Sequence, residues 1–337
     1  MSEAPRSWRV GFWSLIATQF QGAFNDNALK YLVIFLIIGT NLSPDEEEVK
    51  VLLVGSLFAL PFILFSMTGG YFADRFSKRS VTIWTKVFEI GVMLFAIAGF
   101  ALHNMSMSMA AVFLASTQGA LFGPSKYGLL PEILPEKRLS WGNGVIELGT
   151  FLAAILGTMA GAKLSEAFAG REYYSGVFFL ICSVIGLGTS LGILKVPAAD
   201  PSRKFQFNFL ADLFSQGKLI GRDRVLWLAV LGNTYFFFLG ALLQFDIVFY
   251  ARDVLHVTAT HGSILQASIA IGIGFGSLAA GYLSGGKIEY GLIPLGALGI
   301  TVFGFLLAAP GLYFTPYSFS SLCLDFPAAS SLFPLAL

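Results

Sequence analysis

Charged residues are scarce in this sequence. Only 12% of its 337 residues are Asp, Glu, Lys or Arg, whereas 55% are hydrophobic. A soluble domain carries about 25% charged residues, so the composition excludes an ordinary soluble protein and predicts one embedded in a membrane. No basic patch is interleaved with aromatic residues on a polar face, which excludes nucleic acid as a partner.

Residues that commonly carry out catalysis or bind metals are also rare. The two cysteines, Cys182 and Cys323, lie in apolar runs without disulfide or metal-ligand spacing. The three histidines form no pattern with Ser, Asp or Cys that would support nucleophilic or metal-assisted chemistry. We therefore expect a protein that is not an enzyme and that needs no cofactor or metal.

Long apolar runs dominate what is present. A helix needs about 20 apolar residues to cross the hydrocarbon layer, and these runs lack the alternation of membrane strands. The sequence predicts an all-α membrane protein of about ten spans: a six-helix bundle at 1–194, a linker at 195–224 and four further helices at 225–337. The expected spans are 11–39, 51–73, 81–102, 109–130, 141–164, 176–194, 225–250, 262–283, 291–309 and 312 onward.

Basic residues predict the orientation of these spans. With the N-terminus in the cytoplasm, 16 of the 21 Lys and Arg residues, Lys86 among them, fall on the cytoplasmic side and four on the other side. This is the asymmetry of the positive-inside rule. The linker contains FQFNFLADLFSQGK, which predicts a short amphipathic helix at the inner leaflet. We interpret it mainly as a connection between two bundles, with lipid sensing as the alternative.

The first span contains the stretch QFQGAFNDNALKY, at 19–31. Asp26 and Lys30 lie one helical turn apart, with Asn25 and Asn27 beside the carboxylate. At about 1.5 Å per residue, Asp26 is roughly 22 Å beyond Gly11, in the outer half of the membrane. Ionisable residues at such depth are costly and usually mark a pathway. We favour a binding role over the alternative, a structural pair that neutralises itself.

Two further spans carry candidate polar residues. In FGPSKYGLLPEIL, Pro124 predicts a kink, and Lys126 and Tyr127 follow it. Glu147 lies in the fifth span, where we expect it to face a cavity or a basic partner such as Lys126. A lysine that extends to the membrane surface is the alternative interpretation of Lys126.

An internal match adds Gln244 to the candidates. FQGAFNDN, from Phe20, aligns with FLGALLQF, from Phe238, so that Asp26 corresponds to Gln244. In a transporter built from two repeats, such positions face each other across the central cavity.

The loop between the second and third spans reads GYFADRFSKRSV, with the spacing G-x-x-x-D-R-x-x-K-R. An aspartate and several basic residues in a short loop can form a charge lock that a conformational change must break. The pattern resembles the signature loop of the major facilitator superfamily, with Ser77 where that pattern usually has glycine. The resemblance implies a two-bundle fold of twelve helices, so we expect a C-terminally truncated chain. The expected lock residues are Gly70, Asp74, Arg75, Lys78 and Arg79.

The segments GAFNDNALKY, FGPSKYGLLPEIL and NGVIE are similar to the bacterial lysophospholipid transporter family. The resemblance implies movement of lysophospholipid, mainly lysophosphatidylethanolamine, from the outer to the inner leaflet of the bacterial inner membrane. It also implies an acyltransferase–acyl-carrier-protein synthetase as the partner that re-acylates the product. Where this chain has Gln244, we expect a basic residue in that family, a departure that bears on head-group preference. The head-group residues that the resemblance implies are Asn25, Asp26, Asn27, Lys126 and Tyr127.

Two other interpretations stay open. A proton-coupled drug or metabolite antiporter would use Asp26 or Glu147 as its proton site, although the fifth span has Gly157 and Gly161 without the proline of the usual antiporter motif. The second is a non-transporting membrane domain of a fused acyltransferase.

Overall fold

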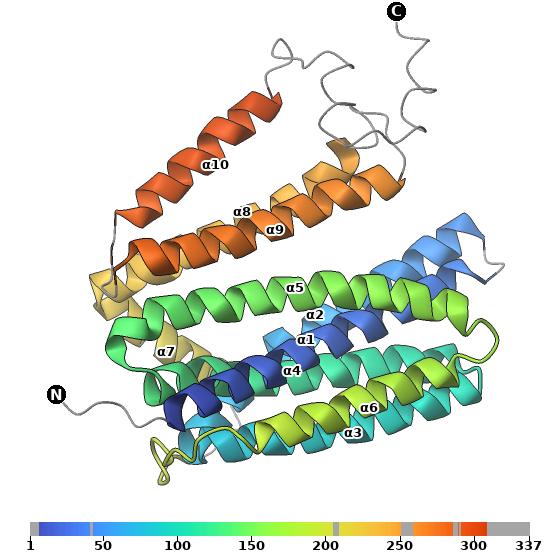
Figure 1. The fold of residues 1–337 in the computed structure, drawn as a ribbon, viewed down its shortest axis with the longest axis horizontal. Coiled ribbons are helices and arrows are strands. Elements are labelled where there is room, and N and C mark those ends of the chain that lie inside the picture. The colour runs from blue at the N-terminus through green and yellow to red at the C-terminus, as the bar shows by residue number, and fades with distance from the viewer. Residues whose placement is uncertain are drawn as a thin grey trace, which may run out of the picture. The chain divides into compact units, whose positions relative to one another are not determined.

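A computed structural model describes residues 7–40, 43–204, 209–250, 259–285, 289 and 291–308. Within these ranges all regular secondary structure is helical (Figure 1). The nine expected spans from 11–39 to 291–309 are each matched by a helix, and α7 is the helix expected in the linker. The tenth expected span lies outside the described residues. The helices are α1 (Ser7–Ile38), α2 (Pro44–Arg75), α3 (Lys78–Ala101), α4 (Met105–Ile133), the 3-10 turn η1 (Glu136–Arg138), α5 (Leu139–Ala167), α6 (Tyr173–Ser190), α7 (Phe209–Arg222), α8 (Arg224–Phe249), α9 (Ala259–Leu283) and α10 (Leu292–Ala308).

Several of these helices can cross a membrane by length and composition. In the described part of the chain, five segments meet both requirements, and three shorter helical segments are also apolar. The five are Asp45–Arg75, Lys78–Ala101, Met105–Ile133, Glu136–Ala167 and Tyr173–Ser190; the shorter ones are Arg224–Gly240, Ile271–Leu283 and Leu292–Leu306.

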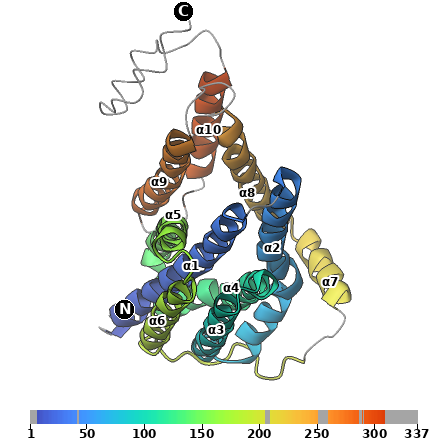
Figure 2. The same ribbon diagram turned by 90° about the vertical axis from the view of Figure 1, so that its right-hand side faces the viewer.

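The chain divides into two compact units, Met1–Lys287 and Ile288–Leu337. In the first unit α1 runs through the middle, with α4, α5 and α6 packed around it (Figure 2). The described part of the second unit contains the apolar helix α10. The polar residues of α1 are therefore surrounded by other helices of the same unit.

Local sequence signals mark where two of these helices begin. Ser43 caps α2 in a capping box with Glu46, and Pro44 occupies the first helical turn. Asn104 caps α4 by accepting a hydrogen bond from the backbone N–H of Met107 at 3.1 Å. His103 just before it has a φ of 49°, so the chain reverses sharply between α3 and α4.

Glycine allows α5 to approach α1 closely. A Cβ atom at Gly157 would lie 2.5 Å from the carbonyl oxygen of Phe24, and one at Gly161 would lie 2.6 Å from that of Ala28. The two backbones are therefore in contact, as small residues permit between membrane helices.

Two apolar cores lie on either side of a polar layer along α1. One core contains Phe12 and Leu15, near the start of the helix, and the other contains Leu29 and Leu32, nearer its end. The polar layer between them is buried and contains Thr18, Gln19, Asn25 and Asp26 of α1 together with Lys86, Glu89, Gln118 and Ser183 of neighbouring helices.

Candidate functional site

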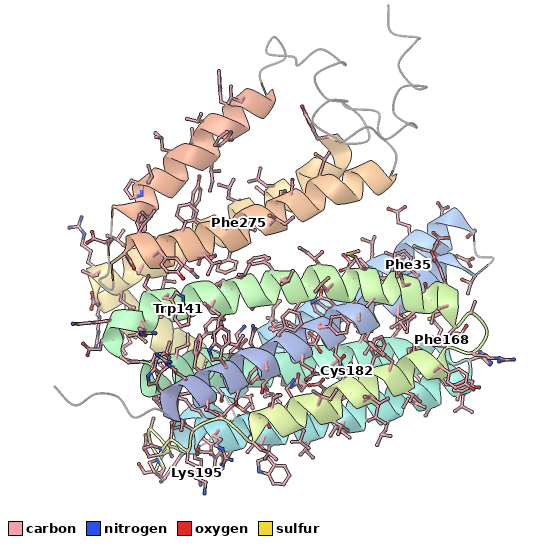
Figure 3. All side chains as sticks on the ribbon, viewed as in Figure 1. Phe35, Trp141, Phe168, Cys182, Lys195 and Phe275 are labelled. Carbon is pink, nitrogen blue, oxygen red and sulfur yellow. The ribbon has the colours of Figure 1, made fainter. Side chains whose placement is uncertain are left out.

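Part of the polar layer forms a hydrogen-bonded network around Glu89, between α1, α3 and α6. Lys86 and Glu89 are completely buried and form an ion pair, with Nζ 2.6 Å from Oε2. Gln21 bridges them, since its Nε2 donates to Glu89 at 2.8 Å and its Oε1 accepts from Lys86 at 2.8 Å. Asn25 Nδ2 and Ser183 Oγ donate to the same Glu89 oxygen, at 3.1 and 2.9 Å. Ser183 follows Cys182, which is labelled on α6 in Figure 3. This network satisfies a carboxylate that would otherwise be very costly to bury.

This network corrects the assignment of Lys86 to the cytoplasmic side. Lys86 lies eight residues into α3, about 12 Å from the start of the helix, and it pairs inside the bundle. Neither Lys86 nor Glu89 was among the predicted site residues. The signal that could have identified them is their i, i+3 spacing within an apolar span, which places opposite charges on one helix face.

Asp26 faces α4 from a different side of α1 and has no such network. Its side chain is nearly buried, at 9% exposure. Its Oδ1 has no hydrogen-bond partner among the described residues. A Cβ atom built on Gly119 would lie 3.3 Å from Oδ2 of Asp26 and 3.5 Å from the ring of Phe62. Asp26 therefore lies where α1, α2 and α4 meet, with an oxygen free to accept a hydrogen bond.

Lys30 does not pair with Asp26. Its ammonium lies over two aromatic rings instead, 4.4 Å from the centroid of Phe58 and 4.6 Å from that of Tyr31. No ion pair joins Lys30 to a carboxylate in the part of the chain that the structure describes. The i, i+4 spacing allows a pair, but the contacts that this ammonium makes are with the two aromatic rings.

The two asparagines beside Asp26 point in other directions. Asn25 is fully buried against Glu89 and Ser183, and Asn27 donates to the carbonyl oxygen of Ala23 at 2.8 Å, within α1. Successive helical residues differ by about 100° in direction, so the structure does not bring the predicted trio together at one site.

A second polar group links α4 and α5. The hydroxyl of Tyr127 donates to Oε1 of Glu147 at 2.9 Å, and the ammonium of Lys126 lies 4.5 Å from the centroid of the Tyr127 ring. Lys126 is seven residues from Gly119 along α4, about 10 Å along the axis. Asp26 and Lys126 therefore occupy different levels of the bundle, and α4 is a continuous helix through this region.

Gln244, the expected counterpart of Asp26, lies in α8. Its side chain is outside the part of the chain that the structure describes, so the expected opposition of Asp26 and Gln244 stays a prediction.

The loop between α2 and α3 makes specific contacts with the linker. Asp74 forms an ion pair with Arg203, and its carbonyl oxygen accepts from the backbone N–H of Asp200 at 2.8 Å. Arg75 donates to the carbonyl oxygen of Arg203 at 2.7 Å.

The last two of the expected lock residues, Lys78 and Arg79, begin α3 and contact other helix ends. Lys78 pairs with Glu132 of α4, and Arg79 donates to the carbonyl oxygen of Leu191, at the end of α6, at 2.8 Å. The backbone at Gly70 is open, since a Cβ atom there would meet no atom within 4 Å.

An apolar cleft of about 200 Å³ lies between α5 and α9. Figure 3 labels Phe275 of α9 in this region. Leu148, in its wall, directly follows Glu147 in the sequence, so the cleft reaches the level of Glu147 along α5. Its lining residues are Leu148, Leu152, Ile155, Ile271, Phe275 and Leu278.

Comparison with known proteins gives matches over most of the chain. The family model of the Major Facilitator Superfamily matches residues 15–337. The chain is 29% identical to the lysophospholipid transporter LplT of Klebsiella pneumoniae (strain 342) over 310 residues, which cover 89% of this chain and 73% of that one. It is 30% identical to LplT of Pectobacterium carotovorum subsp. carotovorum (strain PC1), over 80% of this chain and 64% of the relative. The crystal structure of the human organic anion transporter MFSD10 (TETRAN) is similar with a TM-score of 0.62 at 16% identity, covering 86% of this chain and 74% of that chain, a likeness of fold alone.

Proposed function

This chain belongs to the major facilitator superfamily, and we propose that it moves lysophospholipid from the outer to the inner leaflet of the bacterial inner membrane. Its family and its relatives show that it is a multi-pass membrane transporter. The names of those relatives support a lysophospholipid as the substrate. In this proposal an acyltransferase–acyl-carrier-protein synthetase re-acylates the product.

One observation carries the substrate proposal: a nearly buried carboxylate with an oxygen that no described residue satisfies, at Asp26. Such an oxygen is costly to leave without a donor. The ammonium of a phosphoethanolamine head group supplies three donors and a compensating charge. Lys126 is the cation that we assign to the phosphate. Because the two side chains lie about 10 Å apart along α4, they act at successive stages of transport.

The remaining candidate residues have supporting roles in this proposal. Tyr127 and Glu147 hold the polar group next to Lys126, and Asn25 and Asn27 pack α1 against its neighbours. We also assign Lys30 and Gln244 to the residues that bind the lysolipid head group.

The acyl chain needs an apolar surface next to the polar groups. The cleft between α5 and α9 offers an apolar surface that reaches the level of Glu147 along α5. We assign the single acyl chain of the lysolipid to this cleft.

The orientation and the lock belong to the same proposal. With Lys86 inside the bundle, the remaining basic residues still concentrate on one side, which supports a cytoplasmic N-terminus.

Contacts of Asp74 and Arg75 with the linker support a lock that opens during transport. We keep the division into a bundle at 1–194, a linker at 195–224 and a second bundle at 225–337.

The test is leaflet transfer in proteoliposomes that contain the full chain. Labelled lysophosphatidylethanolamine should move across the bilayer, while diacyl phosphatidylethanolamine should not. Asp26→Asn should reduce transfer about tenfold or more, because a hydrogen bond to a charged group contributes about 1.5–3 kcal/mol. Asp45→Asn, the same change at an exposed position of α2, is the control. Absence of transfer by the wild type, or full transfer by Asp26→Asn, would refute the proposal.

A further inference from the structure

Lys86 lies close to α1 at Gly22, one helical turn from Asp26. A Cβ atom at Gly22 would be only 2.7 Å from Nζ of Lys86. Gly22 and Asp26 are four residues apart and therefore share a face of α1, about 6 Å apart along the axis. The missing side chain at Gly22 leaves the space through which the ammonium approaches this face.

The neighbouring helix α4 gives the same placement independently. Nζ of Lys86 lies 5.9 Å from the ring centroid of Phe122, whereas Asp26 approaches Gly119, one turn away on α4. Lys86 and Asp26 thus occupy successive levels of the same seam between α1 and α4.

The hydrogen bonding of the two groups is complementary. An ammonium has three N–H donors, and the described residues accept two from Lys86, at Gln21 and Glu89. Asp26 has an acceptor oxygen, Oδ1, that receives no hydrogen bond from the described residues. An unused donor and an unused acceptor of opposite charge therefore lie one turn apart.

We propose that Lys86 is a specificity-determining residue, an internal counter-ion that Glu89 and Asp26 share. When Lys86 pairs with Glu89, the Asp26 carboxylate is free for the ammonium of a substrate. When Lys86 reaches along Gly22 to Asp26, it competes with that ammonium. Glu89 thereby sets how strongly the protein prefers a cationic head group. This inference rests on the proposed lysolipid function.

Two variants should change head-group preference in opposite directions. Glu89→Gln weakens the hold on Lys86, which then pairs with Asp26 and lowers the preference for lysophosphatidylethanolamine over lysophosphatidylglycerol. Lys86→Met combined with Glu89→Gln removes the competitor and raises that preference. Each shift should be about fivefold, the lower end of measured coupling between interacting sites. A purely structural ion pair predicts that neither variant changes the ratio.

The measurement is the ratio of binding constants for the two fluorescent lysolipids, with the purified full chain in detergent. Lys163→Met with Glu166→Gln is the matched control, since it makes the same exchanges at the same i, i+3 spacing on exposed positions of α5, and it should leave the ratio unchanged. In an Asp26→Asn background, removing Lys86 should no longer raise the ratio.

The outcomes separate the two proposals. If the wild type binds neither lysolipid, the proposed function and this inference both fail. If the wild type binds both but the variants shift the ratio in the same direction or not at all, only the role of Lys86 is refuted. If Glu89→Gln does not fold, the charge-free double variant still decides, because an unchanged ratio there refutes the inference.

Discussion

Asn25 and Asp26 are neighbours in sequence, yet their surroundings differ completely. Asn25 lies in the network of Lys86 and Glu89, where its amide donates at 3.0–3.1 Å to the Glu89 carboxylate and to α6. Asp26 faces α4 and keeps an unpaired oxygen. Asn25 also has an oxygen, Oδ1, without a partner among the described residues, but its amide nitrogen ties α1 to α3 and α6. We interpret the face of Asn25 as the one that holds the bundle together and the face of Asp26 as the one that binds a ligand. The difference identifies Asp26, rather than the more heavily bonded residues, as the place for a substrate.

Breaking the satisfied network should have the largest effect on stability. Glu89→Ala removes the buried carboxylate that accepts from Lys86, Gln21, Asn25 and Ser183, and breaking a buried ion pair typically costs about 3–5 kcal/mol. We expect a large loss of folded protein, measured by thermal unfolding in detergent. Glu166→Ala, at an exposed position of α5, should change stability by less than about 0.5 kcal/mol. A small effect of Glu89→Ala would contradict the structural role of this network.

Replacing each of the two neighbours by alanine tests the comparison directly. Asn25→Ala removes donors from buried acceptors and should destabilise the protein by about 1–3 kcal/mol. Asp26→Ala removes an unsatisfied group, so its stability should equal or exceed that of the wild type, while lysolipid transfer is lost. Unfolding curves and transfer assays on both variants provide the measurement. Equal destabilisation by the two changes would remove the distinction between the faces.

A surface ion pair should matter much less than the buried one. Asp74 and Arg203 are both partly exposed, with 40% and 31% of their side chains accessible. Arg203→Ala should cost at most about 1 kcal/mol, and the loss should shrink as salt is added. Unfolding curves in low and high salt measure this change in the free energy of unfolding. A cost comparable to that of Glu89→Ala would show that exposure does not decide how much each ion pair contributes to stability.

The smallest expected effect concerns Asp200 in the exposed linker. The hydroxyl of Ser202 donates to its carboxylate at 2.6 Å, and hydrogen bonds from Ser202 together with nearby Arg203 lower the pKa of Asp200 below its usual value. Because its pKa is lowered in the folded protein, the ionised carboxylate of Asp200 stabilises the linker contacts at pH above its ordinary pKa of about 3.9. This contribution is lost as the pH falls through the pKa of Asp200 in the folded protein. Ser202→Ala should raise the pKa of Asp200, which NMR titration of labelled aspartate measures. An unchanged pKa would show that this hydrogen bond is not the main cause.

The length of the apolar runs was sufficient to predict most of the helices. The helices α1 to α6 and α8 to α10 coincide with predicted spans because an apolar run of this length has few other stable arrangements in a membrane. The helix in the linker was also predicted from local sequence. The placement of Lys86 was wrong because a charge count treats a lysine near a predicted span end as part of a loop.

Sequence alone determined that Asp26 lies within a long, mostly apolar helix, since the apolar residues on both sides of it are visible from residue order. It could not determine which charges are paired. Three consecutive residues, Asn25, Asp26 and Asn27, point toward different neighbours because a helix turns about 100° per residue. Only the packing of α3, α4 and α6 around α1 decided that Glu89 is satisfied and that Asp26 is not, because hydrogen bonding between distant segments depends on which helices meet.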